Sequence, residues 1–301
     1  MIIVKLMGGI GNQMFQYACG YNLALKYHVP LALDHSFLEE KPIPEGRTPR
    51  DYELHAFNID LRLRQREINI RPPMEEPPQT GGWWKRLRES IGGKKYYTFF
   101  EEDTTRLDFS FFEHGKRQYL VGYFQNELYF ADHQKEVRKN FTFVPIKSTA
   151  NLKLAQAIKD AENPVSIHVR RGDYLTLGGG KIHGVCPLEY YAKGIDIIKT
   201  RVKRPTFFVF SADDPKWARE AFTAFGLGDS VVGDENTGAY GYENMRLMSL
   251  CKHHIIANSS FSWWGAWLND KPDKIVIFPE RWMADPRQQH FNPSPPSWMR
   301  V

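Results

Sequence analysis

The stretch "IIVKLMGGIGNQMFQYACGYNLALKYHVPLALD", from Ile2 to Asp34, decides the fold class of this chain. It opens with a continuous apolar run, turns through "GGIGNQ", continues with apolar residues at helical spacing and ends on a second apolar run, "PLALD". A strand, a glycine-rich turn, a helix and a second strand make a βαβ unit. Such a unit predicts an α/β fold with a parallel sheet covered by helices.

A second unit of the same kind is expected after about residue 150. The apolar runs "PVSIHV", "TFFVF" and "HIIA" lead into the polar segments "RRGDY", "SADDP" and "NSSFSWW", and helical stretches lie between them. We therefore expect two Rossmann-like domains, 1–150 and 151–301, with a return of the tail to the first domain left open. Frequent proline and glycine breaks predict a loop-rich insertion at about 41–118.

Composition and charge limit the class of protein. The chain has 301 residues, of which 42% are hydrophobic, enough to bury two medium cores. Its 40 basic and 35 acidic residues leave a net charge of +5, which favours an anionic small-molecule partner over wholesale nucleic-acid binding. Cys19, Cys186 and Cys251 are far apart and form no C-x-x-C pair, so we expect neither a disulfide framework nor a zinc site. We therefore expect the protein to function in a reducing compartment.

The relation of the chain to membranes is read from its apolar runs. "MIIVKLMGG" is too short for a signal peptide, and no uncharged span is long enough to cross a bilayer. We expect a cytoplasmic protein. The aromatic and basic stretch at 83–95 leaves two alternatives open, peripheral contact with anionic lipid or a plain solvated insertion.

In "HVRRGDY", two arginines follow a predicted strand. Ligands of open α/β sheets bind outside the carboxyl ends of the strands. A guanidinium donates two parallel hydrogen bonds to a phosphate and stays charged at any working pH, so Arg170 and Arg171 predict a diphosphate site. In the alternative, one arginine, Arg171 more readily than Arg170, bonds Asp173 and fixes the loop.

Polar residues also follow the other two strands. Asp213 is free to face the crevice, whereas Asp214 precedes Pro215 and is expected to cap a helix. The chain contains no D-x-D, so no metal is expected. Ser259 and Ser260 stand before an aromatic helix and predict either an anion site or a simple cap.

That aromatic helix carries Trp263, Trp264 and Trp267. Their i, i+1, i+4 spacing favours packing in a core over a platform for stacking a ligand.

Two other classes of function compete with a phosphate-binding enzyme. Gly9 and Gly11 match the first half of the dinucleotide fingerprint, and Asp34 stands where a ribose-binding acid would, but Met14 replaces the third glycine. An NAD-dependent oxidoreductase is therefore the main rival. The tripeptide at 171–173 is the adhesion sequence Arg-Gly-Asp, yet it abuts an apolar strand and should be poorly exposed.

Five blocks together resemble the bacterial alpha-1,2-fucosyltransferase family. They are "GGIGNQMFQYA", "HVRRGDY", "HGVCPLEYY", "FFVFSADDP" and "YENMRLMSLCKHHIIANSSFSWWGAWLN", and they run from Met7 to Asn269. The resemblance implies a GT-B architecture of two facing Rossmann-like domains. It also implies transfer of L-fucose, with inversion and without metal or other cofactor, from GDP-β-L-fucose to the 2-hydroxyl of a terminal β-galactoside. The acceptor would be an oligosaccharide or a lipid-linked glycan of bacterial glycan or O-antigen biosynthesis.

The resemblance also implies roles for single residues. Arg170 would bind the β-phosphate, and Arg170 and Asp173 are the predicted catalytic residues. His168 and Asp213 would contact the guanine nucleoside. The remaining predicted donor-site residues are Arg171, Ser259, Ser260, Asn12 and Gln13.

The acceptor side is less defined by the sequence. Asp51, Glu53 and Glu127 are candidates for a general base, and a leaving phosphate oxygen could accept the proton in place of any of them. Tyr123 and Phe124 could stack on a galactose ring or pack in the core.

Overall fold

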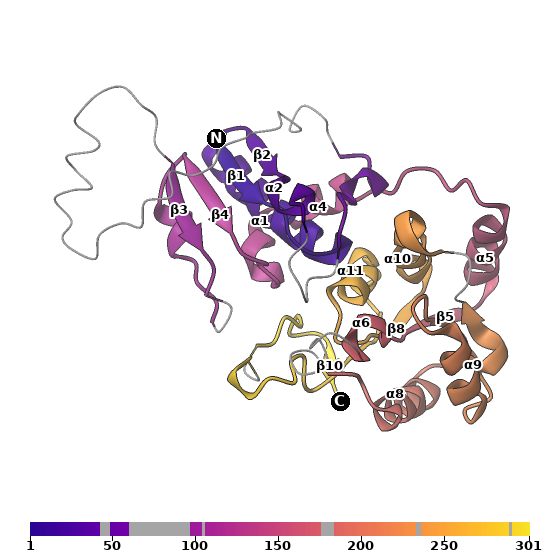
Figure 1. The fold of residues 1–301 in the computed structure, drawn as a ribbon. Helices are drawn as coiled ribbons and strands as arrows, with labels where there is room; N and C mark the ends of the chain where they lie inside the picture. The colour runs from indigo at the N-terminus through magenta and orange to yellow at the C-terminus, as the bar shows by residue number, and fades with distance from the viewer. Residues whose placement is uncertain (43–48, 60–96, 104–105, 176–183, 233–235, 289–290) are drawn as a thin grey trace, which may run out of the picture.

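In a computed structural model of the protein, the described residues are 1–42, 49–59, 97–103, 106–175, 184–232, 236–288 and 291–301. They form two sheets that lie side by side, each with helices around it, and α11 lies between the two units (Figure 1). The stretch at 83–95 falls outside the described residues. Among those described, no helix is both long and apolar enough to span a bilayer.

The first sheet has the strand order β2-β1-β4-β3, and all neighbours are parallel. Its strands are β1 (Ile2–Lys5), β2 (Leu31–Asp34), β3 (Thr98–Glu101) and β4 (Gln118–Val121). Parallel strands are covered on both faces, which is why β1 and β2 read as continuous apolar runs. β3 lies in the stretch expected to be a loop-rich insertion, where the surrounding glycines and prolines concealed its β-favouring Thr-Phe-Phe run.

The second sheet has the order β10-β9-β8-β5-β6-β7, again parallel throughout. Its strands are β5 (Asn163–His168), β6 (Pro205–Phe210), β7 (Val231–Val232), β8 (His253–Ile255), β9 (Val276–Phe278) and β10 (Met299–Arg300). The runs predicted as strands are β5, β6 and β8. The tail adds β10 beside β9, so its last residues join the second sheet.

The α-helices are α1 (Ile10–Tyr27), α2 (Ser36–Glu39), α4 (Gln134–Asn140), α5 (Thr149–Asp160), α6 (Gly172–Leu175), α8 (Leu188–Arg201), α9 (Pro215–Thr223), α10 (Tyr242–Leu250) and α11 (Ser260–Leu268). Short 3-10 turns are η1 (Leu54–Ala56), η3 (Ser110–Glu113), η4 (Glu127–His133), η5 (Gly228–Ser230), η6 (Gly238–Tyr240) and η7 (Pro286–Gln288). α1 starts earlier than its apolar spacing indicates, because the N–H groups of Asn12 and Gln13 already donate to the carbonyl of Gly9. Asn12 and Gln13 therefore belong to the first helical turn and not to a preceding loop.

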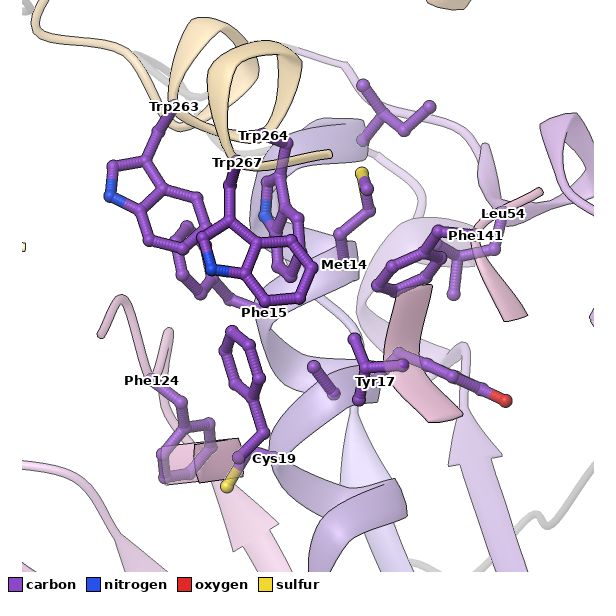
Figure 2. Packing of buried hydrophobic residues seen from close by; sticks show 14 of the residues in the cluster. Met14, Phe15, Tyr17, Cys19, Leu54, Phe124, Phe141, Trp263, Trp264 and Trp267 are labelled. Atoms are coloured by element: carbon purple, nitrogen blue, oxygen red, sulfur yellow. The ribbon is translucent and has the colours of Figure 1, made fainter. Parts of the chain in front are cut away.

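The largest core cluster joins the two units through α1 and α11. Figure 2 shows Trp263, Trp264 and Trp267 of α11 packed over Phe15 of α1. The ring centroid of Phe15 lies 4.5 Å from that of Trp263 and 4.8 Å from that of Trp264. The expectation that these tryptophans pack in a core is confirmed, and this core holds the two units against each other.

Candidate active site

A cavity of about 600 Å³ lies between the two units and is lined by residues of both. From the first unit come the turn after β1, with Gly8 and Gly9, and the first turn of α1. From the second come the ends of β5 and β6 and the residues that precede α10 and α11. This is the carboxyl-end position at which open α/β sheets bind ligands.

The N-termini of three helices line the cavity. Gly9 caps α1, Gly241 caps α10 and Ser259 caps α11, and all three residues are part of the cavity wall. Free N–H groups and the helix dipole give a helix N-terminus a partial positive charge, and at α1 the carboxylate of Glu53 already accepts from the N–H of Ile10. With Arg170 and Arg50 on the same wall, the cavity is suited to an anion with several oxygens, such as a diphosphate.

Arg170 stands two residues after the end of β5 and lines the cavity. Its Nη1 lies 3.4 Å from Oδ2 of Asp213, and its guanidinium carbon lies 5.4 Å from the ring centroid of Tyr174. The side chain keeps 26% of its surface exposed. It is thus oriented by neighbours and still open to a ligand.

Arg171 has a different position from Arg170. Its guanidinium lies 3.7 Å from the ring centroid of Trp217, and its Nε lies 3.3 Å from Oδ2 of Asp214. Asp214 also accepts a hydrogen bond from the N–H of Trp217, which confirms its predicted role as the cap of α9. Arg171 is not among the described residues that line the cavity. The structure therefore places Arg171 against α9. Of the two arginines predicted to form a diphosphate site, Arg170 alone lies on the described cavity wall.

His168 and Asp213 both line the cavity and carry buried atoms that lack partners. Within the described part of the chain, Nδ1 of His168 and Oδ1 of Asp213 make no hydrogen bond. Burial, with the neighbouring Arg170 adding to it, lowers the pKa of His168 to about 3, so its ring is neutral at neutral pH. Oδ2 of Asp213 accepts from the N–H of Arg171 at 3.0 Å. The remaining atoms suit a polar ligand such as a nucleoside.

Asp173, predicted to be catalytic, lies in α6, and its side chain is outside the described residues.

Asn12 and Ser260 meet across the two units. Oδ1 of Asn12 accepts hydrogen bonds from the hydroxyl of Ser260 at 2.7 Å and from Nε2 of Gln125 at 2.8 Å. Ser259 caps α11 without a side-chain hydrogen bond to the helix, so the simple capping alternative is not observed for its hydroxyl. Asn12, Ser259 and Ser260 all line the cavity, and the anion site at the two serines stays a prediction.

Gln13 has a supporting position instead of a place on the cavity wall. It is fully buried, its Nε2 donates to the carbonyls of Gly8 and Asp51, and its Oε1 accepts from the N–H of Glu53. These bonds hold the segment 51–53 against α1. Gln13 thus acts on the cavity through the residues that it positions.

Of the residues predicted for the acceptor side, some line the cavity in the structure and others do not. Tyr123 lines the cavity, whereas Phe124 is fully buried in the core. Glu53 lines the cavity, Asp51 is exposed, and Glu127 accepts a hydrogen bond from Nε1 of Trp267.

Several residues of the cavity wall escaped prediction from the sequence. They are Arg50, Gln125, Asn236, Thr237 and Asn244. Asn236 donates to Oδ1 of Asn151 and of Asn244, which ties the segment before α10 to α5. The block "YENMRLM" was a signal for this region, but nothing local in it shows that Asn244 faces a cavity.

Asp34, on which the interpretation as a dinucleotide-binding protein depended, does not line the cavity. Asp34 is buried, with Oδ1 accepting from the N–H of Ser36 and Oδ2 accepting from the hydroxyls of Ser36 and Tyr119. Asp34 therefore holds the start of α2, and no ribose-binding acid remains at that position.

Gly11 makes the close approach of α1 and α11 possible. A methyl group added there would lie 2.6 Å from the carbonyl carbon of Ser260 and 2.7 Å from the nitrogen of Phe261, both backbone atoms. We expect Gly11→Ala to lower the free energy of unfolding by about 1–3 kcal/mol and to weaken anion binding, because the two helix N-termini must separate.

Urea unfolding and titration with GDP measure both effects of Gly11→Ala. Gly9→Ala is the matched control for stability, since a methyl group there would meet nothing closer than 3.5 Å. Equal stability of the two variants would contradict the close approach.

Among the described residues, no group of three or more His, Cys, Asp or Glu side chains is placed to hold a metal ion.

The two parallel sheets with an anion-suited cavity between them define a GT-B glycosyltransferase architecture. NodZ, an alpha-1,6-fucosyltransferase co-crystallised with GDP, superposes with a TM-score of 0.50 over 92% of this chain and 94% of its own, at 15% identity. This likeness concerns the fold.

A family model, glycosyl transferase family 11, matches residues 1–301, and the chain belongs to this family. An alpha-1,2-colitosyltransferase of Escherichia coli is 34% identical and covers 100% of this chain and 99% of its own. The Escherichia coli O-antigen biosynthesis glycosyltransferase WbnK is 34% identical over 93% of this chain and 94% of its own. A galactoside alpha-(1,2)-fucosyltransferase 1 of Saimiri boliviensis boliviensis is 25% identical over 87% of this chain and 63% of its own. The resemblance found in the sequence is confirmed.

Proposed function

We propose that the protein transfers L-fucose from GDP-β-L-fucose to the 2-hydroxyl of a terminal β-galactoside, with inversion and without a metal ion. The observation that carries this proposal is the position of Arg170 on a cavity wall that also contains the N-termini of α10 and α11. A GDP-sugar has its two phosphates at its centre, and this wall offers them fixed positive groups.

The chemistry follows from the position of Arg170. As the bond between C1 and the phosphate oxygen stretches, negative charge grows on the β-phosphate, and Arg170 stabilises that charge more in the transition state than in the ground state. The ion pair with Asp213, at 3.4 Å, keeps the guanidinium in place. His168 and Asp213, with their unpaired buried atoms, are proposed to contact the nucleoside.

A second donor is favoured by one observation. A relative 34% identical over the whole chain is named a colitosyltransferase. Colitose is fucose without its 3-hydroxyl, so the same diphosphate site could serve GDP-colitose. The acceptor is proposed to be a galactose-ended oligosaccharide or lipid-linked glycan made on the cytoplasmic side of a bacterial envelope.

The test is a set of transfer assays with GDP-fucose and GDP-colitose against β-galactosides linked to glucose, GlcNAc or GalNAc. Product linkage and released free sugar are both measured, so that hydrolysis is not mistaken for transfer. We expect an alpha-1,2-linked product with GDP-fucose and no requirement for added metal. Transfer with GDP-colitose alone would reassign the donor, and absence of transfer with either would contradict the proposal.

A comparison of GDP binding with NAD binding distinguishes this proposal from the rival one, an NAD-dependent oxidoreductase. GDP at about 100 times its Kd is expected to stabilise the fold by about 2.7 kcal/mol, whereas NAD is expected to leave Tm unchanged. A larger shift with NAD than with GDP would favour the oxidoreductase.

A further inference from the structure

The cavity wall carries one acidic side chain from each unit. Among the described residues that line it, the acids are Glu53, from the first unit, and Asp213, from the second. Asp213 is already engaged, through Oδ2, with Arg170 and with the N–H of Arg171. His168 is neutral and a very weak base, since burial lowers its pKa to about 3. Glu53 is therefore the carboxylate of the wall that belongs to the other unit from Arg170, the group proposed to bind the leaving phosphate.

The structure holds Glu53 in place from several directions. Its N–H donates to Oε1 of Gln13 at 2.9 Å, and Nε2 of Gln13 donates to the carbonyl of Asp51 at 2.8 Å. The following residue, Leu54, is fully buried. A methyl group added to Gly9 would lie 3.5 Å from Oε2 of Glu53 and 3.8 Å from the guanidinium carbon of Arg50. Both side chains thus reach the first turn of α1, at the edge of the cavity.

The surroundings of Glu53 make its carboxylate more basic than a surface one. Burial raises its pKa, and the nearby Asp51 acts in the same direction. Arg50, the N–H of Ile10 and His55 oppose this, but the net direction is upward. A carboxylate whose pKa is raised toward the working pH is a better proton acceptor that is still ionised.

We propose that Glu53 is the general base that accepts the proton of the acceptor hydroxyl, an assignment that rests on the proposed function. The acceptor oxygen forms a bond to C1 of the donor sugar, and its proton moves to the Glu53 carboxylate. The bond between C1 and the β-phosphate oxygen breaks, and its electron pair leaves with GDP. Glu53 comes from the first unit and Arg170 from the second, and inversion requires the acceptor oxygen to attack C1 on the face opposite the leaving phosphate.

Glu53→Gln tests the assignment, because an amide oxygen can still accept from the N–H of Ile10. We expect kcat for transfer to fall by about 10²-fold, at the lower end of the range for a general base, since a phosphate oxygen can partly replace it. Tm and the Kd for GDP should stay unchanged. Glu136→Gln is the control, the same substitution at an exposed glutamate of α4 that does not line the cavity, with activity expected to be that of the unmodified protein.

The pH profile of the unmodified protein gives a readout that does not depend on a variant. Glu53 must be deprotonated to act, so kcat should fall on the acid side with an apparent pKa above 4.5, the usual value for glutamate. This acid limb should be absent in Glu53→Gln. If Glu53→Gln transferred at a rate within threefold of the unmodified protein and kept the acid limb, the assignment of Glu53 would be wrong while the proposed function would stand. The same conclusion would follow if Glu53→Gln changed only Tm and GDP binding. Failure of the unmodified protein to transfer would overturn the proposed function and the assignment together.

Discussion

Arg170→Ala is expected to lower the rate of sugar transfer by about 10²-fold to 10³-fold, which corresponds to about 3–4 kcal/mol of lost transition-state stabilisation. The guanidinium is a fixed donor at the cavity wall, and the charge that it faces grows as the bond to the phosphate breaks. The fold should survive, because the ion pair with Asp213 is partly exposed and such pairs contribute little to stability. Initial rates at saturating GDP-fucose measure the effect.

Two further substitutions sharpen this prediction. Arg170→Lys keeps the charge but loses the planar fork, so we expect an intermediate rate. Arg171→Ala changes the neighbouring arginine, which packs on Trp217 and lies outside the described cavity wall, so its loss should appear in Tm more than in donor binding. Near-normal transfer by a folded Arg170→Ala variant would contradict the proposed role.

The sequence predicted those residues of the candidate site that closely follow one predicted strand. β5, β8 and the second half of β6 are largely buried and therefore appear as apolar runs, and the residues after such a run lie at the carboxyl edge of the sheet. Arg170 and Asp213 could be found in this way. Arg171 could not be separated from Arg170, because its contact with Trp217 depends on α9, more than forty residues further along the chain.

What the sequence could not predict depends on segments that meet only in three dimensions. The role of Gln13 depends on a bond to the carbonyl of Asp51, and that of Asn244 on a bond to Asn236. Glu53 lines the cavity and Asp51 does not, because Glu53 is held beside the first turn of α1 by a contact that no local pattern shows. The first turn of α1 was missed because Gly11, which disfavours a helix by propensity, is required there by the backbone of Ser260.

Trp264→Ala is expected to lower the free energy of unfolding by about 3–5 kcal/mol, the usual cost of removing a large aromatic side chain from a core. Trp264 is fully buried, its ring centroid lies 5.5 Å from that of Phe130 and 5.1 Å from that of Phe141, and its Nε1 donates to the carbonyl of Gly11 at 2.9 Å. The substitution leaves a cavity at the contact between α1 and α11 and removes the hydrogen bond that joins the two helices there.

Because the core cluster around Trp264 is continuous across both units, the loss should destabilise both of them. Urea unfolding followed by tryptophan fluorescence and by circular dichroism should show coincident transitions in the unmodified protein and a lower midpoint in the variant. Leu152→Ala is the control, since Leu152 is 52% exposed and its loss should change stability by no more than about 0.5 kcal/mol. A cost below about 1 kcal/mol for Trp264→Ala, far under the expected range for a core aromatic, would mean that α11 does not hold the two units together. The cavity between the two units would then need another source of rigidity.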